Sequence, residues 1–287
     1  MSIPLAVSKM MTESLPILTP DKEQFIVAQQ PFYEVVAQER SVFEAAYQSQ
    51  IPILLKGPTG CGKTRFVQYM AHKLNRPLIT VSCHEDLSAS DLIGHYLLRG
   101  DSVFWNDGPM TAAVRLGAIL YLDEIVEARK DTIVAIHSLS DHRRTLSIDK
   151  LAIQLTATEG FMLVISYNPG YQSLLKELKP STRQRFVSLA FDYPPLEKET
   201  EIIHVESGIN KDTALLLTQL AGKIRQLKSR GLDEGVSTRL LIHAARLIQS
   251  NISPFQACHA AFTQTLSDDP TLCMSIDQLI LDFFPQI

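Results

Sequence analysis

The sequence predicts an α/β domain with a parallel five-stranded sheet between helices, followed by a small all-helical domain. The first observation is a set of short apolar runs that are continuous instead of alternating. Such runs are typical of strands buried on both faces, as in a parallel sheet covered by helices. The second is a change in the spacing of apolar residues at Pro194 and Pro195: the sequence beyond them shows only helical spacing. The five runs, rich in Ile, Leu and Val, cover residues 51–55, 78–82, 119–122, 161–166 and 186–191.

Helical spacing accounts for most of the remaining elements. In the first domain it occurs over residues 62–74 and 111–116. In the second domain, residues 212–230 place apolar side chains at near-helical intervals, at Leu216, Leu217, Leu220 and Ile224. A second helix is expected over residues 237–250, with Thr238 as its N-cap. A third is expected to start near Ser253 and Pro254, because serine caps helices and proline suits the first helical position.

Composition excludes several classes of protein. With 287 residues, the chain has room for roughly two domains. It carries 27 Lys and Arg against 31 Asp and Glu, a net charge of −4, which argues against a nucleic-acid binder. No apolar run is long enough to span a membrane, and no signal peptide is evident. The four cysteines form no CxxC pair, so we expect reduced thiols and a cytoplasmic protein. Residues 1 to about 24 are expected to form a loose arm.

Residues 57–64, GPTGCGKT, fit the pattern GxxxxGK[ST] and directly follow a predicted strand. Glycines let the backbone turn its N–H groups around phosphate oxygens, and the helix that starts near Lys63 adds the positive end of its dipole. Lys63 supplies a charge to the phosphates and Thr64 a hydroxyl to Mg²⁺. A chance glycine-rich turn is the alternative, and Cys61 is read as a small residue that fits. The residues expected to bind the nucleotide are Gly57, Pro58, Thr59, Gly60, Cys61, Gly62, Lys63, Thr64 and Arg65.

A second motif is separated from Lys63 by 59 residues, where the apolar run 117–122 ends in Asp123 and Glu124. In a P-loop enzyme, this is where Asp123 would hold Mg²⁺ through water and Glu124 would orient and polarise the attacking water. Asn168 ends a neighbouring predicted strand and is placed to contact the γ-phosphate or that water. The alternatives are an ordinary acidic strand end and a simple turn, since Asn-Pro-Gly is also good turn chemistry.

Three arginines are candidates for completing the site. Arg183 and Arg185 stand two residues apart, so they do not share a helical face, and they suit a segment that reaches toward a neighbouring subunit. An arginine supplied in trans neutralises charge that develops in phosphoryl transfer. Arg239 lies in the helical domain. The alternatives are a solvated charge pair for the first two and a cation at a helix start for Arg239.

Taken together, these residues resemble the MoxR group of AAA+ ATPases, and within it the CbbQ, NorQ and NirQ subfamily, CbbQ most of all. The segments that carry the resemblance include GPTGCGKTRFVQYMAHKL, RPLITVSCHEDLSASDLIGHYLL, YLDEIVEARKD, PSTRQRF and FDYPP. It implies Walker A at Lys63 and Thr64, Walker B at Asp123 and Glu124, and sensor 1 at Asn168. It also implies an arginine finger at Arg183 or Arg185, catalytic contributions from these residues, and sensor 2 at Arg239.

The same resemblance implies a domain plan and partners. The ATPase core would cover residues 25–194 and the lid 195–287, with a helix-2 insert at about 94–107 and a hairpin before sensor 1 at about 144–159. It implies ATP and Mg²⁺ as cofactors and a homo-hexameric ring. A CbbQ-type ATPase works with a von Willebrand factor A domain partner, CbbO, to release tight-binding sugar phosphates from Rubisco. A NorQ- or NirQ-type ATPase acts on nitric oxide reductase with NorD, and this stays the alternative client.

Two other classes of function fit parts of the pattern. One is a nucleotide-sensing module that hydrolyses little ATP, and the other is a metabolic kinase with a phosphate-binding loop. The only tryptophan, Trp105, and its neighbour Phe104 lie in the expected insert. We expect them to be buried where the insert packs; if exposed, they would be suited to gripping a partner.

Overall fold

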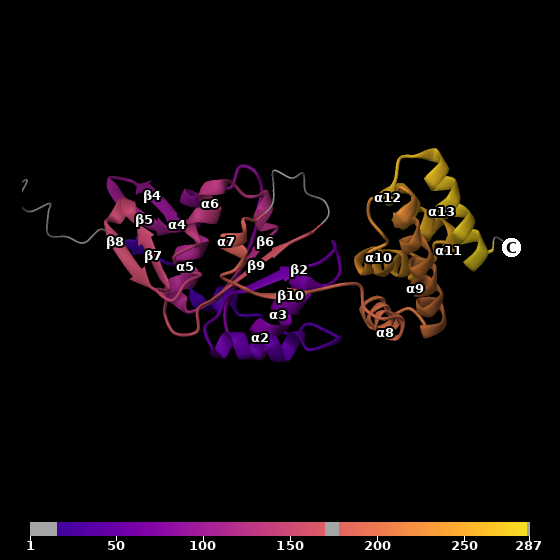
Figure 1. Ribbon diagram of the computed structural model, residues 1–287, viewed down its shortest axis with the longest axis horizontal. Helices are drawn as coiled ribbons and strands as arrows, with labels where there is room; N and C mark the ends of the chain where they lie inside the picture. The colour runs from indigo at the N-terminus through magenta and orange to yellow at the C-terminus, as the bar shows by residue number, and fades with distance from the viewer. Residues whose placement is uncertain (1–15, 170–177, 286–287) are drawn as a thin grey trace, which may run out of the picture.

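The structure of the protein, a computed structural model, describes residues 16–169 and 178–285. Its two parts lie side by side and are joined by the chain that follows β10 (Val187–Ala190) (Figure 1). The first part contains the strands and the helices that cover them. In the second part, the described residues form only helices and their connections. The predicted α/β domain followed by a helical domain is therefore confirmed.

All five strands of the main sheet are parallel, in the order β10-β2-β9-β6-β3. The carboxyl ends of β2, β9 and β6 consequently meet at one edge, which is where ligands bind in open α/β sheets. Each predicted apolar run becomes one strand, with small shifts at its ends. The remaining strands of this sheet are β2 (Ile53–Lys56), β3 (Leu78–Ser82), β6 (Ile119–Asp123) and β9 (Met162–Tyr167).

The three central strands, β2, β6 and β9, are buried on both faces, which explains why their sequences are almost continuously apolar. Ile53 and Leu55 pack with Phe66 on one face, whereas Leu54, between them, packs with Ala113 on the other. Successive side chains of a strand point to opposite faces, so two covered faces require an apolar residue at every position. The helices of this part are α2 (Glu39–Gln48), α3 (Lys63–Lys73), α4 (Ala89–Ile93), α5 (Pro109–Leu116), α6 (Lys130–Ala135) and α7 (Pro180–Arg183).

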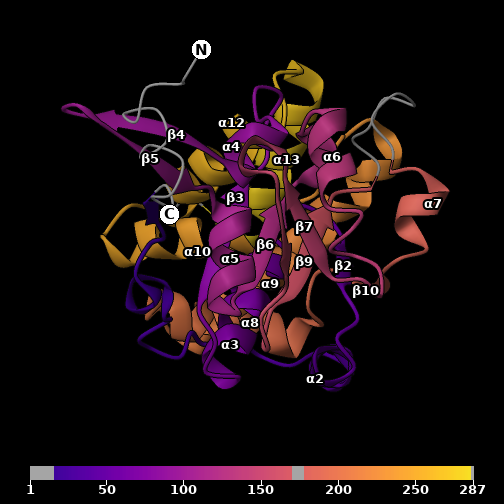
Figure 2. The same cartoon turned by 90° about the vertical axis from the view of Figure 1, so that its left-hand side faces the viewer.

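Two antiparallel hairpins extend the first part. β4 (Gly94–Arg99) pairs with β5 (Ser102–Asp107), over the range where the insert is expected, and β7 (Thr145–Ile148) pairs with β8 (Ile153–Thr156) within 144–159. The Tyr96 hydroxyl donates to the Lys150 carbonyl at 2.6 Å, so the hairpins touch. Figure 2 shows the β4–β5 hairpin and α7 projecting from opposite sides of this part. Trp105 is buried and Phe104 is half-buried.

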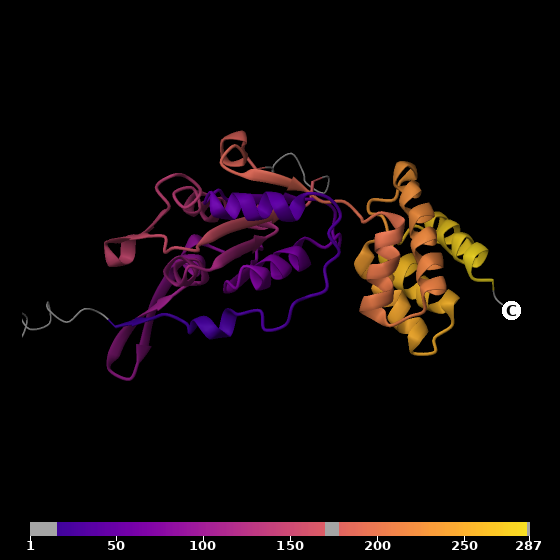
Figure 3. The same cartoon turned by 90° about the horizontal axis from the view of Figure 1, so that it is seen from below.

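The described end of the N-terminal arm differs from the expectation of a loose segment. β1 (Ile17–Leu18) adds to β5 as a parallel strand, and a 3₁₀ turn follows at Lys22–Phe25. The segment then runs along the core toward the second part (Figure 3). Pairing with β5 satisfies its backbone groups, and this long-range contact leaves no periodicity in so short a stretch. Residues 1–15 lie outside the described residues.

The second part, here called the lid, consists of helices around one apolar cluster that includes Leu217, Leu220 and Ile224. Leu216, predicted with them, is 36% exposed. The N-cap of α10 is Ser237, not Thr238 as predicted, because the Ser237 side chain accepts from the Leu240 N–H. Ser253 caps α11, as predicted. The lid helices are α8 (Leu196–Ser207), α9 (Lys211–Arg225), α10 (Thr238–Gln249), α11 (Pro254–Cys258), α12 (Gln264–Leu266) and α13 (Pro270–Phe283).

Candidate nucleotide site

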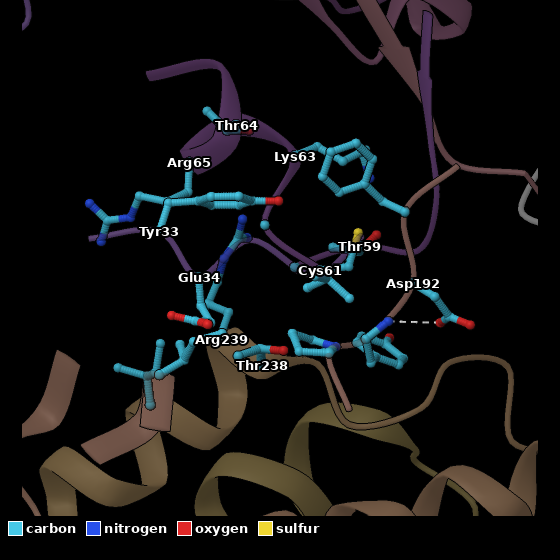
Figure 4. A pocket seen from close by; sticks show the side chains of 18 of the residues that line it. Tyr33, Glu34, Thr59, Cys61, Lys63, Thr64, Arg65, Asp192, Thr238 and Arg239 are labelled. Atoms are coloured by element: carbon cyan, nitrogen blue, oxygen red, sulfur yellow. Dashed lines mark hydrogen bonds between the residues drawn. The ribbon is translucent and has the colours of Figure 1, made fainter. Parts of the chain in front are cut away.

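A cavity of about 670 Å³ lies at the carboxyl edge of the sheet, between the core and the lid. Figure 4 shows side chains entering it from the loop 57–64, here called the phosphate loop, from the N-terminal segment around Tyr33 and Glu34, and from the lid. A cavity of this size accommodates a drug-sized ligand. It gathers most of the residues that the sequence singled out, among them Thr59, Gly60, Cys61, Gly62, Lys63, Thr64, Arg65, Asp123, Glu124, Asn168 and Arg239.

The glycine-rich loop ends at Gly62, whose φ of 100° lies in the left-handed region and which caps α3. Lys63 is therefore the first residue of the helix and only 7% exposed. Its ammonium donates to the carbonyls of Gly57 and Pro58, both at 2.8 Å, and to Asn168 Oδ1 at 2.7 Å. Burial lowers the pKa of this ammonium, because it disfavours the charged form. The loop thus holds a partly desolvated cation, which attracts phosphate more strongly than a hydrated one.

The side chains of Thr64 and Asp123 meet where β6 ends. Thr64 Oγ1 donates to Asp123 Oδ2 at 3.1 Å, which leaves two oxygen atoms facing each other at the start of α3. The other carboxylate oxygen, Oδ1, accepts from the Tyr121 hydroxyl at 2.8 Å and from the Ser166 hydroxyl. These two donors, from β6 and β9, fix the orientation of the carboxylate. Neither Tyr121 nor Ser166 was selected from sequence, although Tyr121 lies two residues before Asp123 on the same face of β6 and Ser166 lies two residues before Asn168.

Glu124 adopts φ 56° and ψ 46°, a left-handed conformation that is uncommon for residues other than glycine. Its N–H donates to Ser166 Oγ at 3.1 Å, which holds this backbone in place. The turn directs the carboxylate toward Asn168, whose Nδ2 donates to Glu124 Oε1 at 3.1 Å and to Thr59 Oγ1 at 3.1 Å. Because its Oδ1 accepts from Lys63, one amide links the phosphate loop to the acidic strand end.

The lid reaches the phosphate loop directly. A Cβ built on Gly60 would lie 2.7 Å from Ser237 Cβ and 3.3 Å from Arg239 Cβ, so the start of α10 rests against the loop. Arg239 extends from α10 into the cavity near Tyr33 (Figure 4). A second contact is the ion pair between Arg65 Nη2 and Glu206 Oε1 of α8, at 2.9 Å.

The N-terminal segment supplies one wall of the cavity, which sequence reasoning missed. The Tyr33 ring packs 5.2 Å from the Phe66 ring, and its hydroxyl donates to Glu39 Oε1 at 3.1 Å. Burial raises the pKa of Glu39, but the N–H groups of Val36 and Ala37 and the Tyr33 hydroxyl stabilise the carboxylate, and the net pKa lies below its ordinary value. This contact between segments has no motif that a sequence pattern could show.

Arg183 and Arg185 lie apart from the cavity residues, at the end of α7 and after it. Arg185 Nη1 donates to the His137 carbonyl at 3.2 Å and pairs with Asp141 Oδ2 at 3.3 Å. Arg183 is exposed, and among the residues that the structure describes none forms a hydrogen bond or ion pair with its side chain. Within the described residues the two arginines therefore differ: Arg185 is bonded to its own chain, and Arg183 is exposed.

Other sequence features do not form a second centre. Burial raises the pKa of the Cys61 thiol, which makes a reactive thiolate unfavourable. Across residues 16–169 and 178–285, no three His, Cys, Asp or Glu side chains group in a way that could hold a metal ion. No helix within these ranges is both long and apolar enough to cross a bilayer.

Comparisons with known proteins identify two matching domains in this chain. Residues 52–186 match the AAA domain (dynein-related subfamily), and residues 199–283 match the CbbQ/NirQ/NorQ C-terminal domain. Protein CbbQ of Hydrogenophilus thermoluteolus is 54% identical over 251 residues, which cover 88% of this chain and 94% of the relative. This chain belongs to the CbbQ/NirQ/NorQ family.

Two further relatives in this family are similar to the same extent. Protein NorQ of Paracoccus denitrificans is 55% identical over 254 residues, covering 88% of this chain and 94% of the relative. The denitrification regulatory protein NirQ of Pseudomonas aeruginosa is 54% identical over 250 residues, covering 87% and 96%. Members of this family are AAA+ ATPases, and this chain is accordingly an ATP-hydrolysing enzyme.

Solved structures show the same fold. A RuvB mutant of Thermotoga maritima superposes with a TM-score of 0.53 at 18% identity, over 88% of this chain and 73% of that one. A putative ATPase of Cytophaga hutchinsonii gives 0.50 at 19% identity, over 87% and 83%.

Proposed function

We propose that ATP binds in the cavity between core and lid, with its phosphates on the loop 57–64. The observation that carries the proposal is the bonded set of Lys63, Thr64, Asp123, Glu124 and Asn168 at one edge of the sheet. Lys63 and the loop N–H groups would bind the phosphates. Arg239, entering from the lid, would sense which nucleotide is present.

The residues at the end of β6 fit a magnesium ion. Mg²⁺ prefers carboxylate, hydroxyl and water oxygens, and Thr64 Oγ1 and Asp123 Oδ2 provide the first two at 3.1 Å from each other. In this proposal Thr64 would hold the ion, and Asp123 would do so through water. When bound, the ion neutralises charge on the phosphates.

Glu124 and Asn168 are proposed to handle the attacking water. The carboxylate of Glu124 accepts the water's hydrogen, which orients and polarises the oxygen. Asn168 holds that carboxylate through Nδ2 and the Lys63 ammonium through Oδ1. A phosphate that draws Lys63 away removes one partner of the amide, so phosphate occupancy is transmitted to the group that positions the water.

We propose Arg183, and not Arg185, as the arginine supplied to a neighbouring subunit. Arg183 is exposed at the end of α7, whereas Arg185 is held by His137 and Asp141 of its own chain. In a homo-hexameric ring of the kind the family resemblance implies, this arginine would neutralise charge at the adjacent site. Assembly and hydrolysis would then be coupled.

The work done by hydrolysis is proposed to be protein remodelling with a von Willebrand factor A domain partner, CbbO-like. Our first proposal for the client is inhibited Rubisco, from which tight-binding sugar phosphates are released; the relative named CbbQ supports it. The second is maturation of nitric oxide reductase with a NorD-like partner, supported by a NorQ relative of nearly equal identity.

The hydrolysis proposal is tested by phosphate release from wild type and Glu124→Gln. We expect the variant to retain ATP binding and to lose about a hundredfold or more in kcat, as for loss of a catalytic base. Glu197→Gln, an exposed carboxylate outside the cavity, is the matched control and should behave as wild type. Equal phosphate release from Glu124→Gln and wild type would contradict the role of Glu124 and end the motor proposal. Full activity of a monomer would favour a P-loop kinase.

The client is tested separately. Rubisco blocked by a sugar phosphate is incubated with this protein, a CbbO-like partner and Mg-ATP, and carboxylation is followed. Recovery that requires all components and is absent with Glu124→Gln supports the first proposal. If Rubisco stays inhibited while nitric oxide reductase gains activity on co-expression with this protein and a NorD-like partner, the second holds.

A further inference from the structure

A polar cluster lies where the linker meets the lid, and two of its members, Tyr193 and Thr238, also line the cavity. We call it the lid clamp: Tyr193, Glu199, Arg225 and Thr238. Glu199 is fully buried, and Arg225 Nη1 and Nη2 donate to its two oxygens, each at 2.7 Å. The Thr238 hydroxyl donates to Glu199 Oε1 at 2.6 Å. This bidentate, charge-assisted arrangement fixes both distance and orientation.

Arg225 has two more contacts that extend the clamp. Its guanidinium carbon lies 4.0 Å from the centre of the Tyr193 ring, within the range of a cation–π interaction. Its Nε donates to the Val236 carbonyl at 2.8 Å. A Cβ built on Gly235 would lie 2.8 Å from Arg225 Cγ, so the chain before α10 passes closely over this side chain.

The clamp joins four segments that the helices alone would not hold in register. Tyr193 belongs to the linker from the core, Glu199 to α8, Arg225 to α9 and Thr238 to the first turn of α10. The residues on either side of Thr238 are the ones that meet the phosphate loop. Ser237 rests on Gly60, and Arg239 enters the cavity. The position of Thr238 therefore determines where both neighbours lie.

We propose that the lid clamp positions the start of α10, and with it Arg239, over the bound nucleotide. This inference rests on the proposed function of the cavity. An apolar cluster would have stabilised the lid at least as well, since burying ions is costly. Unlike an apolar cluster, a bidentate ion pair with a stacked ring holds the segments that it joins in a single relative orientation. It links the linker to α10, so that rotation about the linker carries Arg239 with the lid as one body.

The test uses Thr238→Val, which removes one hydroxyl and keeps the shape of the side chain. We expect equilibrium affinity for a fluorescent, non-hydrolysable ATP analogue to fall about tenfold, as for loss of a hydrogen bond to a charged group. Arg225→Lys keeps the charge but cannot form the bidentate pair, so it should also lower the affinity for the analogue. Lys223→Ala, an exposed cation on the same helix, is the control and should bind as wild type.

Coupling to Arg239 separates positioning from simple stabilisation. In an Arg239→Ala background, Thr238→Val should cause little further loss, because the clamp acts through that arginine. Additive losses, an Arg239→Ala variant with wild-type affinity, or unchanged binding by both clamp variants would overturn the inference. Failure of the wild type to bind the analogue would instead overturn the proposed function.

Discussion

Gly60→Ala tests the contact between phosphate loop and lid. The new methyl group would lie 2.7 Å from Ser237 Cβ and 2.8 Å from Ser237 Oγ, closer than carbon and oxygen atoms pack. Forcing a methyl group into a filled space costs about 1–3 kcal/mol. The lid must move away to relieve the overlap. A ligand that binds only with the lid in place has to restore the overlap, so its binding free energy is reduced by this cost. At about 2 kcal/mol, nucleotide affinity should fall about thirtyfold.

A second cost of the same substitution is separable. Gly60 has φ 68°, where alanine is strained by about 1–2 kcal/mol whatever its neighbours. This strain is present with and without nucleotide, so it lowers the free energy of unfolding and leaves affinity largely unchanged. Thermal unfolding without nucleotide measures the first quantity, and titration with a fluorescent ADP analogue measures the second.

Ser237→Gly supplies the decisive comparison, because it removes both overlapping atoms. Glycine substitutes for serine at an N-cap at a cost of only a few tenths of a kcal/mol, so the single variant should bind nearly as wild type. The double variant Gly60→Ala/Ser237→Gly should regain most of the lost affinity while keeping the lowered unfolding temperature. Normal affinity in Gly60→Ala, or no recovery in the double variant, would show that the loop and lid do not meet as the structure has them.

Three further predictions follow from individual contacts. Glu39 has a pKa below its ordinary 4.5, so it contributes stability above pH 4.5, and this stability is lost as the pH falls through the lower pKa of the folded state. Glu39→Gln should lower the free energy of unfolding at pH 7 by about 1–3 kcal/mol and weaken its dependence on pH in the acid range. Denaturant unfolding across pH measures both quantities, and an unchanged acid dependence would contradict the prediction. Arg183→Ala should lower kcat at least about a hundredfold and leave the melting temperature unchanged. Arg185→Ala should lower the melting temperature, because it loses the contacts to His137 and Asp141. ATPase and melting assays on both variants check this, and the reverse pattern would exchange the roles of the two arginines. Asp107 is buried, accepts from Trp105 Nε1 at 2.9 Å and Thr19 Oγ1 at 2.6 Å, and pairs with Arg115 at 2.9 Å. Asp107→Asn should lower the free energy of unfolding by about 3–5 kcal/mol, because it leaves a half-buried arginine without its counter-charge. It should also shift the fluorescence emission of the only tryptophan to longer wavelength, and an unaltered spectrum would contradict this role of Asp107.

Local pattern was enough to predict the strands and the loop of the site. The run 119–122 lies within β6, where all four residues are buried, because a strand covered on both faces has to be apolar at every position. The motif at residues 57–64 predicted a helix beginning near Lys63, and α3 begins there; phosphate binding by this loop stays a prediction. Asp123 and Asn168 could be paired in advance because parallel strands end at the same edge.

What the sequence determined by itself is thus the parallel sheet, the helical lid and the residues at the strand ends, since each follows from periodicity or from a contiguous motif. Only the tertiary structure decided that Asn168 joins Lys63 to Glu124 and that Ser237 rests on Gly60. It also decided that Arg185 is held within its own chain while Arg183 is exposed. The pairing of residues 17 and 18 with β5 and the buried clamp around Glu199 belong to the same group. These contacts join residues that are distant in the chain, and the packing of whole elements, not any local pattern, brings them within reach.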